Sequence, residues 1–398
     1  MPTAADCALT PLDAQRLAEA LQLAEQAIGR SDPNPRVGCV IARHDGTVLG
    51  RGSTQAAGQA HAEVMALREA AMAGADTHGA TAWVTLEPCA HHGRTPPCCE
   101  ALVAAGIGRV VVATLDPFPE VDGRGVERLR AAGVEVVVAD ASSAIATAAR
   151  ELNLGFFSRV RRGLPWVRMK IAASLDGRTA LANGRSQWIT GPLARADGHA
   201  WRRRASATLT GIGTVLEDDP RLDVREVPTA RQPQRVIVDS RLQTPVRARI
   251  LQPPGTVWIY AGAEGSTAHG EAGAAAARRA ALEATGAVDI RCLAEPTAAG
   301  TGGGKVDLAA MLSDLARRGV NELHVEAGHK LNASLLRAGL VDELLVYLAP
   351  KLIGLGREMA AFGPITELTE ALAFRFIEAS PIGDDLRIRA RPPGREHF

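Results

Sequence analysis

The sequence predicts two α/β domains, and three observations support this fold class. The chain has 398 residues, which is more than one ordinary hydrophobic core accommodates. Apolar runs typical of buried strands alternate with amphipathic runs through both halves, as in layered α/β folds. Each half also carries its own chemistry-bearing motifs. We expect the domains at residues 1–157 and 158–398, because Phe157–Pro165 is rich in arginine and ends in Gly-Leu-Pro.

The first domain is predicted to begin with an amphipathic helix over Pro11–Gly29, a proline-rich loop and a hairpin. The loop, Asp32–Pro35, cannot be helical because each proline restricts itself and the residue before it. It is rigid and can present Asn34 to a substrate. An Asp-Gly turn joins strand Arg36–Ala42 to strand Thr47–Arg51. The elements expected next are helix Ala62–Ala73, strand Ala80–Leu86, helix Glu100–Ala105, strand Arg109–Thr114, helix Gly123–Ala132, strand Val134–Ala139 and helix Ser142–Leu154.

The second domain is predicted to have its own α/β core. A proline at the first helical position supports the helix Pro192–Arg204. The expected strands are Trp166–Ala173, Ala207–Thr210, Arg235–Asp239, Val257–Ala261, Glu322–Glu326, Glu343–Leu348 and Leu386–Ala390. The other expected helices are Ala274–Thr285, Leu308–Arg318 and Leu331–Ala338. We interpret Ala294–Gly304 as a surface insertion, because no Gly-Lys-Ser/Thr follows it in a strand-to-helix frame.

The composition argues against several classes of protein. The formal net charge is only +1, so no overall field attracts nucleic acid or a membrane surface. Aromatic residues are 4% of the chain, which leaves few platforms for stacking bases. The sequence has no apolar run long enough for a membrane helix, no secretory signal pattern and no disulfide-framework spacing. We therefore expect a cytoplasmic protein with reduced thiols and neither a nucleic-acid nor a membrane partner.

The stretch from His61 to Cys99 carries the motif around which the first domain is organised. His61-Ala62-Glu63 is followed by Pro88-Cys89 and then by Cys98-Cys99. A His-x-Glu, a later Pro-Cys and a further cysteine form the signature of zinc-dependent nucleobase deaminases. One imidazole and two thiolates hold Zn²⁺ and leave a fourth position for water. A carboxylate that does not bind the metal must then carry protons, and we expect Glu63 to do so.

The spacing of the motif indicates where its side chains lie. Residues two apart do not share a helix face, so we expect His61 in the first turn of the helix Ala62–Ala73. Cys89 follows a predicted strand, and chemistry on open α/β sheets occurs at such strand ends. Either Cys98 or Cys99 is expected to open the next helix, whose positive end favours a thiolate. A structural zinc site with four protein ligands is the alternative. Donors available for that fourth position are His91, His92 and the second of the adjacent cysteines.

Two sets of motifs together point to one family. In the first half they are Pro33–Gly38, His61–Glu63 and Thr85–Cys98, with eight residues between the two cysteines Cys89 and Cys98. In the second half they are Lys170–Arg178, Ser186–Thr190 and Val325–Gly328. With these motifs the chain resembles the bifunctional riboflavin-biosynthesis deaminase/reductases over nearly its whole length. One departure is Ser53-Thr54, where that family often has an aromatic residue followed by histidine.

The resemblance implies both fold and chemistry. It implies a cytidine-deaminase-like layered α/β domain followed by a dihydrofolate-reductase-like α/β domain. The first would hydrolyse the exocyclic amine of a diaminopyrimidinone carrying ribosylamine 5′-phosphate. The second would use NADPH to reduce the ribosyl group of the product to ribityl. Motif matching implies His61, Cys89 and Cys98 as the Zn²⁺ ligands and Glu63 as the catalytic proton carrier.

The resemblance also implies binding residues. Those implied for NADPH are Ala172, Trp188, Thr214, Asp218, Ser240 and Gly328. Those implied for the pyrimidine ribosyl phosphate substrate are Ser186, Arg202, Leu222, Arg225 and Glu326, while the proline-rich loop offers Asn34. Arginine forks suit a sugar phosphate, which favours Arg202; we expect Arg203 and Arg204 on a solvated face. The expected partners are this small molecule and further copies of the chain in a homo-oligomer.

Two other functions remain as alternatives. One is a zinc deaminase of another nucleobase, a nucleoside or tRNA, with a non-catalytic second domain. The other is a binding protein with a structural zinc. The near-neutral charge and the scarcity of aromatic residues oppose a nucleic-acid substrate.

Overall fold

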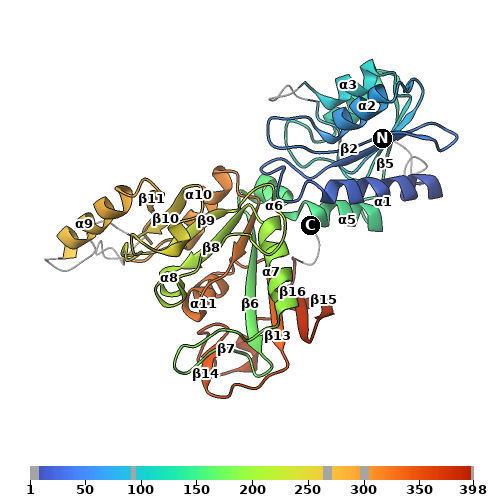
Figure 1. Cartoon of the computed structure of the whole chain (residues 1–398). Coiled ribbons are helices and arrows are strands. Elements are labelled where there is room, and N and C mark those ends of the chain that lie inside the picture. Colours follow the sequence, from blue (N-terminus) through green and yellow to red (C-terminus); the bar gives the residue numbers. More distant parts are fainter. Residues whose placement is uncertain (1–8, 91–95, 263–270, 296–303, 396–398) are drawn as a thin grey trace. The chain divides into compact units, whose positions relative to one another are not determined.

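The computed structural model describes residues 9–90, 96–262, 271–295 and 304–395 (Figure 1). The chain forms two compact units that divide between Gly163 and Leu164. The predicted division after residue 157 falls inside helix α6 (Leu154–Arg162). Phe157 is buried in the core of the first unit, so most of the segment Phe157–Pro165 is packed helix and not an open linker.

The first unit is a five-stranded sheet covered by helices on both faces (Figure 1). The strand order is β2-β1-β3-β4-β5, with β1 antiparallel to both its neighbours and β3, β4 and β5 parallel. The strands are β1 Gly38–Ala42, β2 Val48–Ser53, β3 Thr81–Val84, β4 Arg109–Val112 and β5 Glu135–Val138. The helices before α6 are α1 Pro11–Glu25, α2 Ala62–Met72, α3 Cys98–Ala104, α4 Arg124–Ala131 and α5 Ala144–Leu152. Side chains of α2, α3 and α4 share one core with the sheet, and those of α1 and α5 share the other.

Helix α1 begins where its sequence provides a cap. The hydroxyl of Thr10 accepts a hydrogen bond from the backbone N–H of Asp13, whose carboxylate accepts the N–H of Thr10 in return. The carboxylate of Asp13 also accepts hydrogen bonds from Trp83 on β3 and Arg109 on β4, which ties the helix to the sheet. The predicted helix was four residues longer, but the chain after Glu25 continues in single turns to Gly29 at a φ of 74°.

The predicted helix Ser142–Leu154 is interrupted at Asn153, which separates α5 from α6. The side chain of Asn153 accepts a hydrogen bond from the backbone N–H of Arg36 and donates to the carbonyl of Arg36. With these two bonds the amide of Asn153 satisfies both backbone groups of Arg36, which lies more than a hundred residues away in the sequence. They hold the end of the proline-rich loop against the helix pair.

The second unit is built on a nine-stranded sheet of order β11-β10-β9-β8-β12-β6-β13-β16-β15. The strands from β11 to β13 are parallel, and β16 and β15 are added as an antiparallel edge. The strands are β6 Trp166–Ser174, β8 Ala207–Gly211, β9 Gln234–Val238, β10 Val257–Ala261, β11 Val288–Cys292, β12 Glu322–Val325, β13 Glu343–Ala349, β15 Arg375–Ile382 and β16 Asp385–Arg391. A small separate pair joins β7 Arg178–Leu181 to β14 Gly356–Glu358.

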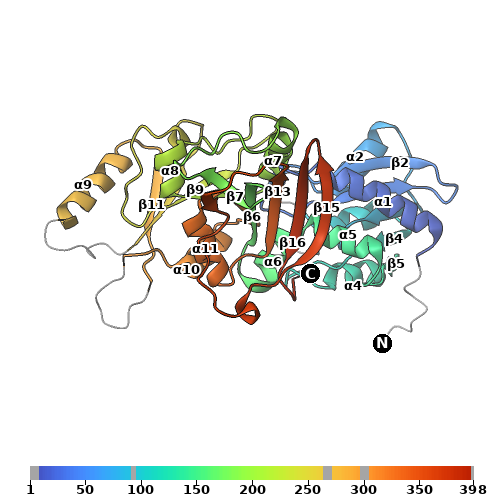
Figure 2. The same ribbon diagram turned by 90° about the horizontal axis from the view of Figure 1, so that it is seen from below.

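Helices cover both faces of this sheet. Figure 2 shows α10 (Leu308–Arg317) and α11 (His329–Arg337) on one side and α7 (Pro192–Arg204) on the other. The face under α10 and α11 is apolar, whereas the face under α7 carries a row of buried charged and polar side chains. The remaining helices of this unit are α8 Ile212–Asp218 and α9 Glu271–Glu283.

Both units are α/β, as predicted, but some elements were missed. The predictions omitted β7, β11, β14, β15 and α8, and they also omitted α6, most of whose residues were expected at the domain boundary. Most of the predicted insertion Ala294–Gly304 lies outside the described residues. Within the part of the chain that the structure describes, no helix combines the length and apolar character needed to cross a bilayer.

Candidate functional site

Three segments of the first unit bring His61, Cys89 and Cys98 together. His61 is the N-cap of α2, Cys89 follows β3, and Cys98 is the first residue of α3. The Nδ1 atom of His61 lies 3.3 Å from the sulfur of Cys98 and 3.6 Å from that of Cys89. All three donor atoms lie within 4.8 Å of one another, so one cation could contact all of them.

Two local predictions change slightly. His61 lies one residue before the first turn of its helix, in extended backbone with ψ of 170°. This extended backbone explains how His61 and Glu63 can share a site although residues two apart diverge within a helix. Helix α3 begins at Cys98, two residues earlier than predicted, and so places Cys98 at its positive end.

The two adjacent cysteines have different partners. Cys98 contributes its sulfur to the cluster, and its backbone N–H lies 3.3 Å from the sulfur of Cys89. The thiol of Cys99 instead donates to the carbonyl of Cys89 at 2.7 Å. Cys99 therefore braces the loop that carries Cys89. His91 and His92, the other donors considered for a fourth ligand, lie outside the described residues.

The donor set fits Zn²⁺. One imidazole and two thiols leave a fourth tetrahedral position for water. The hydrogen bond between the cysteines lowers the pKa of Cys89 to about 4 and raises that of Cys98, so the pair shares one proton. Glu63 is only 3% exposed, and this burial raises its pKa to about 7, with the charge of Cys89 adding to the effect. A buried carboxyl group with such a pKa can both accept and donate a proton near neutral pH.

Glu87 has a role that the sequence did not reveal. Its carboxylate is 3% exposed and accepts four backbone hydrogen bonds. The donors are the N–H groups of Asp116, Gly123, Gly125 and Val126, at 3.2, 3.0, 2.9 and 3.1 Å. Gly125 and Val126 lie in the first turn of α4, where a carboxylate satisfies otherwise unpaired N–H groups. Glu87 thus fixes the segment that leads to Cys89.

Asn34 and Thr54 differ in burial and in their hydrogen bonds. The backbone of Asn34 donates to Ser31 at 2.9 Å, and its half-buried side chain lies in the predicted loop. Thr54 belongs to the pair Ser53-Thr54, where the family often has an aromatic residue followed by histidine. It is 3% exposed, and its hydroxyl accepts a hydrogen bond from the N–H of Val37 at 3.1 Å. Thr54 therefore supports the backbone at the start of β1.

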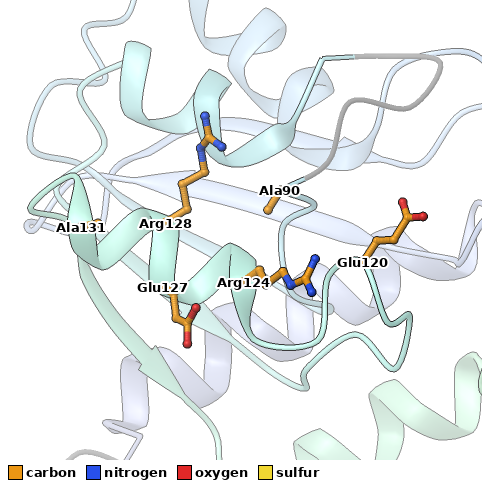
Figure 3. A pocket seen from close by; sticks show the side chains of 6 residues that line it. All are labelled: Ala90, Glu120, Arg124, Glu127, Arg128 and Ala131. Atoms are coloured by element: carbon orange, nitrogen blue, oxygen red, sulfur yellow. The ribbon is translucent and has the colours of Figure 1, made fainter.

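A shallow hollow of about 530 Å³ lies next to Ala90, the residue after Cys89 (Figure 3). Arginines and glutamates alternate around it. Arg128 forms an ion pair with Glu100, while Arg124 extends its guanidinium into the hollow in Figure 3. The residues that line it are Ala90, Glu120, Arg124, Glu127, Arg128 and Ala131. Because the charges balance, the hollow has no net preference for an anion.

The second unit contains a cleft of about 1250 Å³ at the carboxyl ends of its parallel strands. The ends of β8, β9, β10 and β11 and the start of α11 contribute to it, which is the usual location of ligands on open α/β sheets. Three residues expected to bind NADPH line this cleft: Thr214, Ser240 and Gly328. Gly328 is the N-cap of α11, so the positive end of a nine-residue helix faces the cleft.

The other three residues expected at NADPH do not line this cleft. Asp218 lines a neighbouring hollow of about 630 Å³, and the ion pair of Glu217 and Arg357 borders both spaces. Ser186, expected at the substrate, donates to Asp218 at 3.3 Å in that second hollow. Trp188 is 62% exposed and carries the guanidinium of Arg195 over its ring, and Ala172 lies within β6.

Arg202 and Glu326 form the centre of the expected substrate residues. The guanidinium of Arg202 donates to Oε1 of Glu326 at 2.7 Å and to the carbonyl of Asp223 at 2.5 Å. Lys170 on β6 lies 3.7 Å from Oε2 of the same carboxylate. Burial opposes ionisation of Glu326, but the charges of Arg202 and Lys170 hold its pKa well below the usual range. The sequence motif Lys170–Arg178 did not indicate this contact, which depends on the pairing of β6 with β12.

Arg202 is only 8% exposed, and its guanidinium is paired with Glu326 in this structure. Arg225 is 48% exposed in its side chain, and one of its guanidinium nitrogens bonds Asp223 at 3.1 Å. Leu222 is buried at a φ of 53°. The expectation that Arg204 lies on a solvated face is wrong, because its guanidinium pairs with the buried Glu322 at 2.9 Å.

Comparison with known proteins gives one consistent result. A family model described as the RibD C-terminal domain matches residues 165–388. A model described as the cytidine and deoxycytidylate deaminase zinc-binding region matches residues 12–114. The riboflavin biosynthesis protein RibD of Escherichia coli (strain K12) is 43% identical over 388 residues, which cover 94% of this chain and 98% of that protein. The RibD protein of Aquifex aeolicus is 38% identical over 95% of this chain and 98% of its own length.

Solved structures agree with these relatives. RibD of Acinetobacter baumannii matches with a TM-score of 0.81 and 39% identity, covering 96% of this chain and 99% of that one. A diaminohydroxyphosphoribosylaminopyrimidine deaminase/5-amino-6-(5-phosphoribosylamino)uracil reductase of Thermotoga maritima matches with a TM-score of 0.80 and 29% identity over the same shares. The resemblance inferred from the motifs, and the two fold types that it implied, are confirmed. The chain therefore belongs to the RibD family, the bifunctional deaminase/reductases of riboflavin biosynthesis, in which a zinc-binding deaminase domain precedes an NADPH-dependent reductase domain.

Proposed function

We propose that the first unit deaminates a diaminopyrimidinone that carries ribosylamine 5′-phosphate, and that the second unit reduces the ribosyl group of the product to ribityl. The proposal depends most on one observation. A His-Cys-Cys cluster with donor atoms within 4.8 Å of one another stands beside the buried carboxyl group of Glu63. The name of the Thermotoga maritima relative assigns the same two reactions, deamination and reduction, to that protein.

In the deaminase reaction we assign metal binding to His61, Cys89 and Cys98 and proton transfer to Glu63. When bound, zinc makes a water molecule acidic enough to act as a nucleophile near neutral pH. Glu63 then accepts a proton from that water and passes protons to the ring nitrogen and to the departing amine. Its burial keeps competing bulk water away, and its raised pKa suits both directions of transfer. Asn34 is the proposed polar contact to the pyrimidine from the proline-rich loop.

In the reductase reaction we assign the cleft of about 1250 Å³ to NADPH, with Thr214, Ser240 and Gly328 as its contacts. NADPH supplies the hydride when bound, so the protein mainly has to position the acceptor carbon. Opening the ribose ring to a form that accepts hydride requires a proton on the ring oxygen. Lys170 is the ammonium group that Glu326 holds at 3.7 Å, and we assign this proton to it.

The substrate phosphate needs a different arginine from the one that the sequence favoured. We propose that Arg202 mainly orients Glu326, because its Nε and Nη2 atoms both contact Oε1 of Glu326 and its Nη1 atom donates to the carbonyl of Asp223. Arg225 is more exposed and keeps donors available, so we assign the 5′-phosphate to Arg225. Losing one charged hydrogen bond costs about 1.5–3 kcal/mol. Arg225→Ala should therefore lower kcat/KM about 10- to 150-fold for the phosphorylated substrate, but hardly at all for its dephosphorylated form.

Two further proposals concern the cellular compartment and the oligomeric state. Zinc-binding thiols must stay reduced, which favours a reducing compartment such as the cytoplasm. We also retain the homo-oligomer as a proposal. Gel filtration with light scattering tests it, and a monomer over the working concentration range would reject it.

The order of the two reactions provides the test of function. Purified protein is mixed with the aminated ribosyl pyrimidinone and NADPH while ammonia and nicotinamide absorbance are followed together. We expect ammonia release first and then one NADPH oxidised per ammonia. The alternative, a zinc deaminase with a non-catalytic second domain, predicts ammonia release with no loss of nicotinamide absorbance.

A further inference from the structure

His324 on β12 is a buried histidine to which the proposed mechanism assigns no role. Its side chain is 0% exposed, and neither ring nitrogen has a hydrogen-bond partner among the residues that the structure describes. Nε2 lies 3.6 Å from Oε1 of Glu326, which directly follows β12 and is two residues from His324 in the sequence. That distance is just longer than a hydrogen bond. A buried polar ring without partners is costly, so its position calls for an explanation.

The nearest residues across the sheet offer one further candidate partner. In the paired register, His324 stands opposite Thr208 on β8 and opposite Arg168 on β6. Arg168 is committed to Glu322 at 2.7 Å and Glu343 at 2.5 Å. The hydroxyl of Thr208, in contrast, is buried and has no hydrogen-bond partner within the described part of the chain. His324 and Thr208 are thus neighbours on the same face of the sheet, on strands whose backbones lie about 4.8 Å apart.

The protonation state of His324 makes it a suitable hydrogen-bond partner for both Glu326 and Thr208. Burial lowers its pKa to about 3, with Arg202, Arg168 and Lys170 acting in the same direction and only Glu326 opposing them. The ring is therefore neutral at physiological pH and has one N–H donor and one acceptor nitrogen. Glu326 can only accept, so it requires the N–H at Nε2. Nδ1 is then an acceptor, and the hydroxyl of Thr208 can donate to it.

We propose that His324 is a positioning residue for Glu326: Nε2–H donates to Oε1 of Glu326 in the substrate complex, and Nδ1 accepts the hydroxyl of Thr208. Hydrogen bonds in catalytic sites are often long without substrate and shorten in the complex. Arg202 holds Glu326 from helix α7, and His324 would hold it from within the sheet. The carboxylate then keeps one orientation toward Lys170 and the ribose. The inference depends on the proposed reductase function, because it concerns the residue that faces the substrate there.

Three variants of the full-length protein test this role: His324→Leu, His324→Gln and Thr208→Val. The assay is steady-state reduction of the deaminated intermediate by NADPH, with deamination by the first unit as the internal control. His324→Leu should lower kcat about 10-fold or more, with little change in KM for NADPH, since one hydrogen bond to a charged group is lost. His324→Gln should recover most of this loss, because its amide supplies both a donor and an acceptor. Thr208→Val keeps the shape and should lower kcat a few-fold.

Each result decides the matter. A low kcat in His324→Leu together with a nearly normal kcat in His324→Gln supports positioning through hydrogen bonds. Equal losses in folded leucine and glutamine variants, or a wild-type kcat in His324→Leu, would overturn it. If His324→Leu does not fold, Thr208→Val decides, and an unchanged kcat there rejects the proposal. A wild-type protein that never oxidises NADPH would reject the reductase function itself, which is a separate outcome.

Discussion

Glu87→Gln should destabilise the first unit strongly, although Glu87 touches no substrate in our scheme. Oε1 accepts the N–H groups of Gly125 and Val126, and Oε2 accepts those of Asp116 and Gly123. Glutamine keeps one oxygen but turns an NH₂ group toward the other two N–H donors. Each buried donor left without a partner costs about 1–3 kcal/mol. The total of about 2–6 kcal/mol is a large part of the 5–15 kcal/mol that stabilises a typical domain.

The assay is zinc release during denaturant unfolding of the full-length holoenzyme, followed with a chromophoric chelator. Zinc release reports on the first unit because its candidate ligands all lie there. Glu127→Gln is the matched control. Glu127 is exposed on α4, the helix whose first-turn N–H groups donate to Glu87. We expect Glu87→Gln to release zinc at a clearly lower denaturant concentration than the control does. Coincident release curves for the two variants would refute the reasoning about the four backbone hydrogen bonds.

Three further predictions concern the first unit. Glu63→Gln should retain zinc, measured by metal analysis, and lose about 10²–10⁴-fold in deamination; a folded variant without zinc would make Glu63 a ligand. Cys98→Ser should lose zinc and Cys99→Ser should keep about one zinc per chain; the reverse pattern would contradict the assignment. Hydrogen bonds from Arg109 and Trp83 outweigh burial and hold the pKa of Asp13 well below its usual range. Its stabilising effect is therefore complete above the unfolded pKa of about 4 and is lost as pH falls below it. Acid unfolding curves of Asp13→Asn should show a weaker pH dependence than wild type, and identical slopes would exclude this role.

Local sequence signals predicted which side chains cluster in the first unit, because zinc chemistry constrains residue types and spacing. His61, Cys89 and Cys98 were named from their motif, and the structure brings their donor atoms together. The helix Pro192–Arg204 was predicted with its observed bounds, and the proline at its first position was the signal for its start.

What the sequence could not show depends on partners far along the chain. Asn153 ends α5 because it bonds the backbone of Arg36, more than a hundred residues away. Arg204 forms an ion pair with the buried Glu322 on β12 and is therefore largely shielded from solvent. A helical pattern does not predict this contact. Arg202 on α7 and Lys170 on β6 both contact Glu326, and these two contacts depend on sheet order, which the sequence alone does not show.

The most direct test of the central assignment is the coupled reaction of the holoenzyme with the aminated ribosyl pyrimidinone and NADPH. Wild-type protein should release ammonia and then oxidise one NADPH per ammonia. Glu63→Gln should do neither with this substrate, yet oxidise NADPH normally when the deaminated intermediate is supplied. NADPH oxidation by Glu63→Gln at the wild-type rate with the aminated substrate would contradict the division of the two reactions between the two units.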